Sequence, residues 1–139
     1  MSDELREAWL TKAVEALRPK FDDDPEITLP EKVRVSCGWP SSGGLKANNA
    51  TIGQCWLPCS AADGVPQIFI SPKLSEAVRV LDVLLHELIH ACLPEGTGHN
   101  GPFKQACKRL GLEGKATATE AGEELKKELQ AIAEALGEY

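Results

Sequence analysis

The sequence has no long apolar run, no visible export signal and no internal repeat, and each absence excludes a class of protein. A membrane-spanning helix needs roughly 18 consecutive apolar residues, and no stretch of the chain approaches that length. Residues 1–10 are charged from residue 3 onward and lack the apolar segment of a secretory signal. The five cysteines are an odd number without such a signal, so we expect reduced thiols in a cytoplasmic, intracellular protein.

Length and charge limit the architecture and the partners. A chain of 139 residues has the size of one domain with a single core, so we expect one domain over residues 1–139. The net charge of −6 argues against charge-driven binding of nucleic acid over the whole surface. A local basic patch remains compatible with it.

Short strands are expected in residues 32–70, where alternating apolar residues are separated by turn-forming stretches rich in glycine and asparagine. The candidate strands are KVRVSCGW (32–39), ATIGQCWL (50–57) and QIFI (67–70). Three strands at this spacing predict a small antiparallel sheet.

Four segments have helical periodicity. They are residues 3–18, which Pro19 ends; 73–93, for which Ser71-Pro72 suits a start; 102–111; and 119–137. Helices around a small sheet make the predicted fold class α+β, with the sheet packed against the helix of residues 73–93.

All three histidines of the chain lie within fourteen residues, two of them on that helix. At about 100° per residue, the polar residues of the helix fall within an arc of roughly 140°, and the rest of its surface is apolar. This polar stripe consists of Glu76, Arg79, Asp82, His86, Glu87 and His90.

His86, Glu87 and His90 form the pattern H-E-x-x-H, which has a specific chemistry. Histidines at i and i+4 lie one helical turn apart, so both imidazoles can bind one Zn²⁺ ion. Glu87 can act as a general base toward a water molecule without being a ligand. The alternative is two core histidines beside a surface glutamate, but burying two unpaired imidazoles is costly, which favours the metal.

A third ligand is needed, and His99 is the candidate, since it follows His90 after a proline and two glycines that let the chain turn back. The metzincin pattern is excluded because position 96, where it needs a histidine, is glycine. Downstream acids are the alternative ligands, although a solvated helix N-terminus explains them more simply; they are Glu120, Glu123 and Glu124. A second zinc on Cys37, Cys55 and Cys59 is disfavoured against buried thiols.

Three segments together resemble the SprT-like metallopeptidase domain, the family that includes the Spartan-type proteases. They are IFISPKL, LDVLLHELIHAC and GHNGPFKQACKRLGL, within residues 67–112. The tail that starts at residue 114 is similar to small phage or prophage members of that family.

This resemblance implies a compact zincin-like fold and a zinc-dependent peptidase. It implies that His86, His90 and His99 bind one Zn²⁺ ion, that Glu87 is the general base, and that strand 67–70 lies at a sheet edge beside the cleft. Larger family members cleave proteins crosslinked to DNA, so a protein or peptide substrate is expected, with DNA-bound proteins as a narrower class. A non-catalytic zinc-binding module acting on host DNA or transcription proteins is the alternative function.

One group of basic residues follows His99 in this otherwise acidic chain: Lys104, Lys108, Arg109 and Lys115. Positive charge here could steer a DNA-bound substrate toward the zinc. A solvated helix face is the simpler explanation. The only tyrosine, Tyr139, receives no role.

Overall fold

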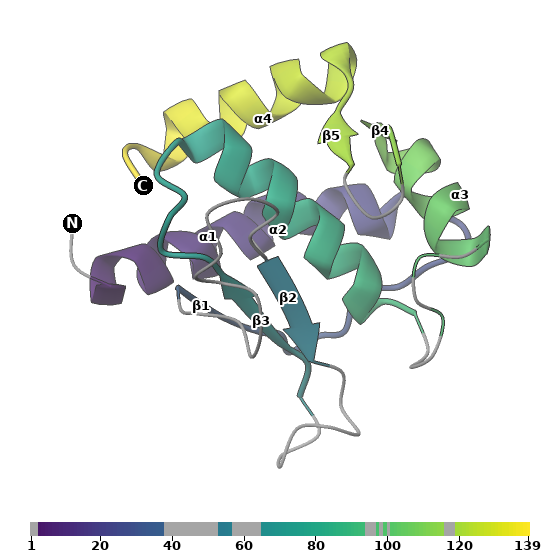
Figure 1. The fold of residues 1–139 in the computed structure, drawn as a ribbon, viewed down its shortest axis with the longest axis horizontal. Coiled ribbons are helices and arrows are strands. Elements are labelled where there is room, and N and C mark those ends of the chain that lie inside the picture. The colour runs from purple at the N-terminus through teal and green to yellow at the C-terminus, as the bar shows by residue number, and fades with distance from the viewer. Residues whose placement is uncertain are drawn as a thin grey trace.

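The computed structural model describes residues 3–37, 53–56, 65–93, 97, 99, 101–115 and 119–139. Their elements confirm the α+β class (Figure 1). In chain order they are α1 (Asp3–Asp22), β1 (Arg34–Cys37), β2 (Gly53–Trp56), β3 (Gln67–Ile70), α2 (Ala77–Ala91), α3 (Gly101–Leu110), β4 (Leu112–Glu113), β5 (Glu120–Ala121) and α4 (Glu123–Leu136).

The three-stranded sheet is mixed, so the prediction of an antiparallel sheet was wrong. Its order is β1-β3-β2, with β3 parallel to β1 and antiparallel to β2. The expectation assumed that strands adjacent in sequence pair with each other, but β3 inserts between β1 and β2. Strand Gln67–Ile70, expected at an edge, is therefore central, and within the described sheet β2 is the edge strand that packs on α2.

One face of the sheet packs against the helices. Val35 lies opposite Ile68 in the ladder and Cys37 opposite Ile70, and these four side chains are buried. α1 packs on β1, while α2 packs on β2 and β3, and α4 covers α1 and α2 on the side away from the sheet (Figure 1). The buried positions of α2 extend around most of its circumference, as its apolar pattern predicts.

Two helix boundaries differ from the prediction. Pro19 lies inside α1, which continues for one more turn because Phe21 is 1% exposed and anchors that turn in the core. α2 begins at Ala77 rather than near Ser71-Pro72, because the Glu76 carboxylate accepts hydrogen bonds from the backbone N–H groups of Val78 and Arg79.

A two-stranded ribbon of β4 and β5 was not predicted, and it replaces the expected first turn of the last helix. Gly111 ends α3 with φ of 97° and accepts a hydrogen bond from the backbone N–H of Gly122 at 2.9 Å. A side chain at Gly122 would meet the Glu113 carboxylate at 2.8 Å, so glycine suits this close approach. The ribbon brings Thr119, just before β5, to α2.

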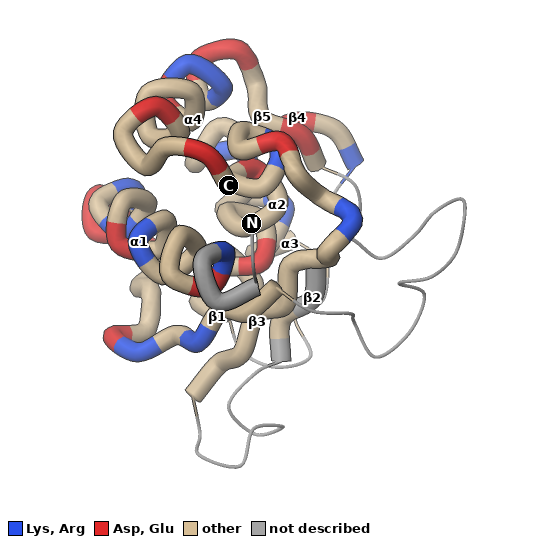
Figure 2. The backbone as a smooth tube through the Cα atoms, turned by 90° about the vertical axis from the view of Figure 1, so that its left-hand side faces the viewer, with Lys and Arg blue, Asp and Glu red and all other residues tan. Residues whose placement is uncertain are grey.

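Outside the polar stripe of α2, acidic and basic residues occur side by side. Acidic and basic positions alternate along α1 and α4 (Figure 2). In the part of the chain that the structure describes, no helix is both long enough and apolar enough to cross a membrane.

Candidate metal centre

The fold brings the three histidines together. His86 and His90 come from adjacent turns of α2, and His99 approaches from the segment before α3. The potential ligand atoms of the three side chains all lie within 4.8 Å of one another. Within the described residues, this is the only group of three or more metal-binding side chains with such a geometry.

The spacing of the ring nitrogens suits a tetrahedral ion. The Nε2 atoms of His90 and His99 are 3.2 Å apart. Two nitrogens that bind one zinc ion at ~2.0–2.1 Å lie roughly 3.3–3.4 Å from each other in tetrahedral geometry. Three imidazoles are also a donor set that zinc accepts, so the residues present fit this metal.

Burial keeps the imidazoles of α2 neutral. It lowers the pKa of His86 to about 4, with His99 and Arg79 adding to the effect. Burial likewise lowers the pKa of His90 to about 3, helped by its two histidine neighbours. Both rings therefore carry a free nitrogen lone pair at neutral pH, which is the form that binds a metal ion.

Phe103 of α3 supports all three rings. It is fully buried, and its ring stacks on His90 at a centroid distance of 4.0 Å and an interplanar angle of 15°. Its centroid lies 4.9 Å from that of His86 and 5.2 Å from that of His99. This shared contact limits the orientations that the three imidazoles can adopt.

Thr119 supports His86 from the β4–β5 ribbon. Its Oγ1 atom lies 2.6 Å from His86 Nδ1, and Thr119 is 7% exposed. When Nδ1 carries the ring proton and donates it to this hydroxyl, Nε2 keeps the lone pair and is available to a metal ion. This contact was not predictable from the sequence, because residue 119 was expected at the start of a helix. Phe103 lies in the segment GHNGPFKQACKRLGL, which resembles the SprT-like family, but no role was predicted for it.

Glu87 lies at the edge of the cluster without belonging to it. Its Oε2 atom is 4.0 Å from His86 Nε2. The residue is 8% exposed, and burial raises the pKa of its carboxyl to about 8. Cys55 of β2 is close enough for Glu87 to raise the pKa of its thiol further, beyond the effect of burial, to about 12. The edge strand β2 therefore runs beside the glutamate.

The alternative ligands are not part of the histidine cluster, or they fall outside the described residues. Glu120 is on β5 and lines a surface hollow with Arg79 and Asp82, and Glu123 and Glu124 form the first turn of α4. Cys37 and Cys55 lie on β1 and β2 with β3 between them, and Cys59 falls outside the described residues. Tyr139 packs against Trp9 with ring centroids 4.9 Å apart, in the core.

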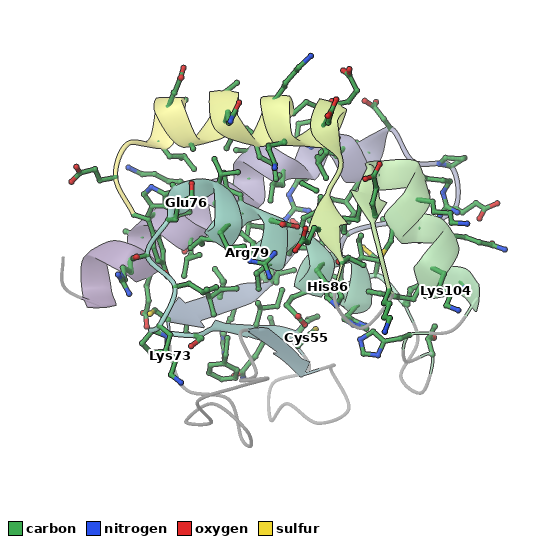
Figure 3. All side chains as sticks on the ribbon, turned by 45° about the horizontal axis from the view of Figure 1, so that its top comes forward. Cys55, Lys73, Glu76, Arg79, His86 and Lys104 are labelled. Carbon is green, nitrogen blue, oxygen red and sulfur yellow. The ribbon has the colours of Figure 1, made fainter. Side chains whose placement is uncertain are left out.

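The four basic residues after His99 do not form one free patch. Arg109 donates to Asp24 at 2.8 Å and lies 3.2 Å from the Glu26 carboxylate. Lys104, Lys108 and Lys115 are exposed and line a separate cavity between α3 and β4. Figure 3 shows Lys104 on α3, to the right of His86 on α2.

No protein-family model, curated protein or solved structure matches the chain. Function must therefore be inferred from the residues of this site and their geometry.

Proposed function

We propose that the protein is a zinc-dependent peptidase. Zinc would be held by His86, His90 and His99, and Glu87 would act as the general base. One observation carries the proposal: three imidazole side chains converge within 4.8 Å, and a buried carboxylate that is not part of the ligand set lies beside them on the same helix. A site that only held a structural metal would gain nothing from that carboxylate.

Each residue has a defined task in this mechanism. When bound, zinc supplies a Lewis acid that acidifies water and polarises a peptide carbonyl. Glu87, in its ionised form, would accept the proton of the attacking water and deliver it to the departing amine. Thr119 fixes the ring orientation of His86 through Nδ1, and Phe103 holds the plane of His90.

The sheet provides a surface for an extended substrate. β2 pairs with β3 on one side only within the described residues, and it runs beside Glu87. A peptide added to the outer edge of β2 would pass close to the glutamate with its backbone paired. The substrate is therefore proposed to be a protein or peptide in extended conformation, and DNA-associated proteins are a narrower version of this proposal.

An intracellular site of action is proposed from the thiols. The four cysteines in the described part of the chain are free, and burial raises the pKa of Cys92 to about 12, so it is an unreactive thiol. Free cysteines are typical of proteins kept in a reducing compartment.

The test compares the zinc-loaded wild type with Glu87→Gln. The substrates are an unfolded general protein and DNA-binding proteins, each with and without DNA. We expect the wild type to cleave, and the variant to lose roughly 10²- to 10⁴-fold in rate. The variant should retain zinc, measured as bound metal per chain, because glutamine keeps the shape of the side chain and Glu87 is not a ligand.

Equal cleavage by both proteins would refute the role of Glu87. If zinc is bound and neither protein cleaves any substrate, the peptidase proposal fails in favour of a non-catalytic zinc-binding module.

A further inference from the structure

A cavity of about 620 Å³ opens between α3 and the β4–β5 ribbon. Its volume lies within the range of roughly 300–1,000 Å³ that is typical of ligand pockets. Cys107 and Leu112 contribute buried apolar surface to it, since they are 3% and 2% exposed. Around them stand the exposed lysines 104, 108 and 115.

The cavity adjoins the metal centre. Thr119 lines it and also contacts His86 Nδ1 at 2.6 Å. Cys107, on its other wall, lies one helical turn after Phe103, the residue that contacts all three imidazoles. The cavity therefore borders a residue that contacts His86, and a group bound in it would lie next to the metal centre.

The cavity is basic in a chain whose net charge is −6. Its three lysines form no ion pair with an acidic residue in the described part of the chain, in contrast to Arg109, which is paired with Asp24 and Glu26. Among the described residues of its lining, Glu113 is the one acidic residue, and its carboxylate approaches the backbone of Gly122. Three unpaired ammonium groups around one hollow are suited to a single anionic group.

We propose that this cavity binds an acidic side chain of the peptide substrate, close to the scissile bond. The inference rests on the proposed peptidase function and names its preferred substrate class. The methylene groups of the acidic residue would contact Leu112 and Cys107, and its carboxylate would lie among the lysines. A nucleic-acid backbone fits less well, because its phosphates need positive charge along a line and these three lysines surround a single cavity.

The experiment measures binding, so it does not depend on turnover. Zinc-loaded Glu87→Gln protein is titrated into fluorescent peptide mixtures that are uncharged except at one central position, fixed as Glu, Gln or Lys. We expect the Glu mixture to bind roughly 5- to 10-fold more tightly than the Gln mixture at low salt, and the Lys mixture to bind most weakly. The preference should shrink as salt is added, because the lysines are exposed.

A triple variant tests the cavity itself. Replacing Lys104, Lys108 and Lys115 with glutamine should abolish the preference for the Glu mixture. The matched control replaces three exposed lysines elsewhere with glutamine, Lys12 of α1 and Lys126 and Lys127 of α4, which changes the net charge equally. Both variants should melt at the temperature of the parent protein, and the control should keep the preference.

The outcomes separate this proposal from the proposed function. No preference for the Glu mixture, or a preference that survives the triple variant, would overturn the acidic subsite even if the wild type cleaves proteins. A preference lost in the triple variant would support the subsite even if no cleavage is found. Duplex DNA that outcompetes the Glu mixture and requires the same lysines would overturn it in favour of a nucleic-acid site.

Discussion

Both halves of α2 carry polar side chains, Glu76 to Asp82 at its start and His86 to His90 toward its end. The two groups differ in the partners of their side chains. In the first half, the Glu76 carboxylate caps the helix, and Arg79 lies 2.9 Å from the buried Asp82 carboxylate. In the second half, no Lys or Arg among the described residues pairs with Glu87, and the ring nitrogens of His86 and His90 lie close to those of His99.

The difference indicates that one part of the polar stripe stabilises the fold and that the other part is suited to binding a metal ion. Buried polar groups that pair within the protein need no external partner, and they serve stability. In the second half, the partners of the two neutral imidazoles are a hydroxyl and another imidazole, and the carboxyl of Glu87 has no cation, so burying these groups is costly in the free protein. A bound cation would be a suitable partner for the imidazoles of the second half. We therefore expect their partner to be a metal ion and not another group of the protein.

The largest expected effect comes from removing a ligand in the second half. We expect His90→Ala to weaken zinc binding by more than the roughly 10- to 100-fold that loss of a supporting hydrogen bond costs. Asp82→Ala, on the same helix, should leave zinc affinity unchanged, because Asp82 pairs with Arg79 and lies outside the cluster. Competition with a chromophoric chelator measures both. Similar losses in the two variants would break the division of α2 into two halves.

A smaller effect is expected at Thr119, which acts on the metal centre only through His86. Thr119→Val keeps the size of the side chain but removes the hydroxyl next to Nδ1, so zinc affinity should fall roughly 10- to 100-fold. Thr119→Ser should restore it, because serine retains the hydroxyl. Nitrogen NMR of the His86 ring reports whether Nδ1 still carries the proton. An unaltered tautomer and unaltered affinity in the valine variant would show that the contact has no positioning role.

The parts of this site that the sequence predicts are those set by helical geometry. His86 and His90 share a face because they are four residues apart, and the apolar residues around the rest of the helix are buried in the core. His99 was predicted from turn-forming residues instead, since the proline and two glycines after His90 allow the chain to turn back.

Contacts between distant segments were not predictable in this way. Residues 32–70 contain no local feature that places β3 between the other two strands, since order in a sheet depends on how the strands pack against α1 and α2. Thr119 reaches His86 only because Gly111 and Gly122 shape a short ribbon, and the acids around it favour a helix start instead. Periodicity therefore predicted the positions of the two α2 histidines but not the residues that support them.

The smallest expected effect tests the first half of α2 by a double-mutant cycle on stability. Burial raises the pKa of Asp82, opposed by a backbone hydrogen bond from Ala121 and by Arg79. Arg79→Ala leaves this carboxylate without a cation and should lower the free energy of unfolding by about 1–2 kcal/mol at pH 7, less than for a fully buried pair because Arg79 is partly exposed. Asp82→Ala should cost about 1 kcal/mol, and the double variant less than the sum, with a coupling of about 0.5–1 kcal/mol.

The pH dependence of this cycle has a definite sign. The ionised form of Asp82 is the form that burial penalises, so the destabilisation by Arg79→Ala should grow as the pH rises through the pKa of Asp82, which lies above its ordinary value of 3.8. It should shrink at lower pH, where the carboxyl is protonated and needs no cation. Urea unfolding of metal-free protein measures this destabilisation at pH 7 and in the acid range. Additive losses that do not change with pH would mean that Arg79 and Asp82 are neighbours without being coupled, and the contrast with the histidine half would then lose its electrostatic basis.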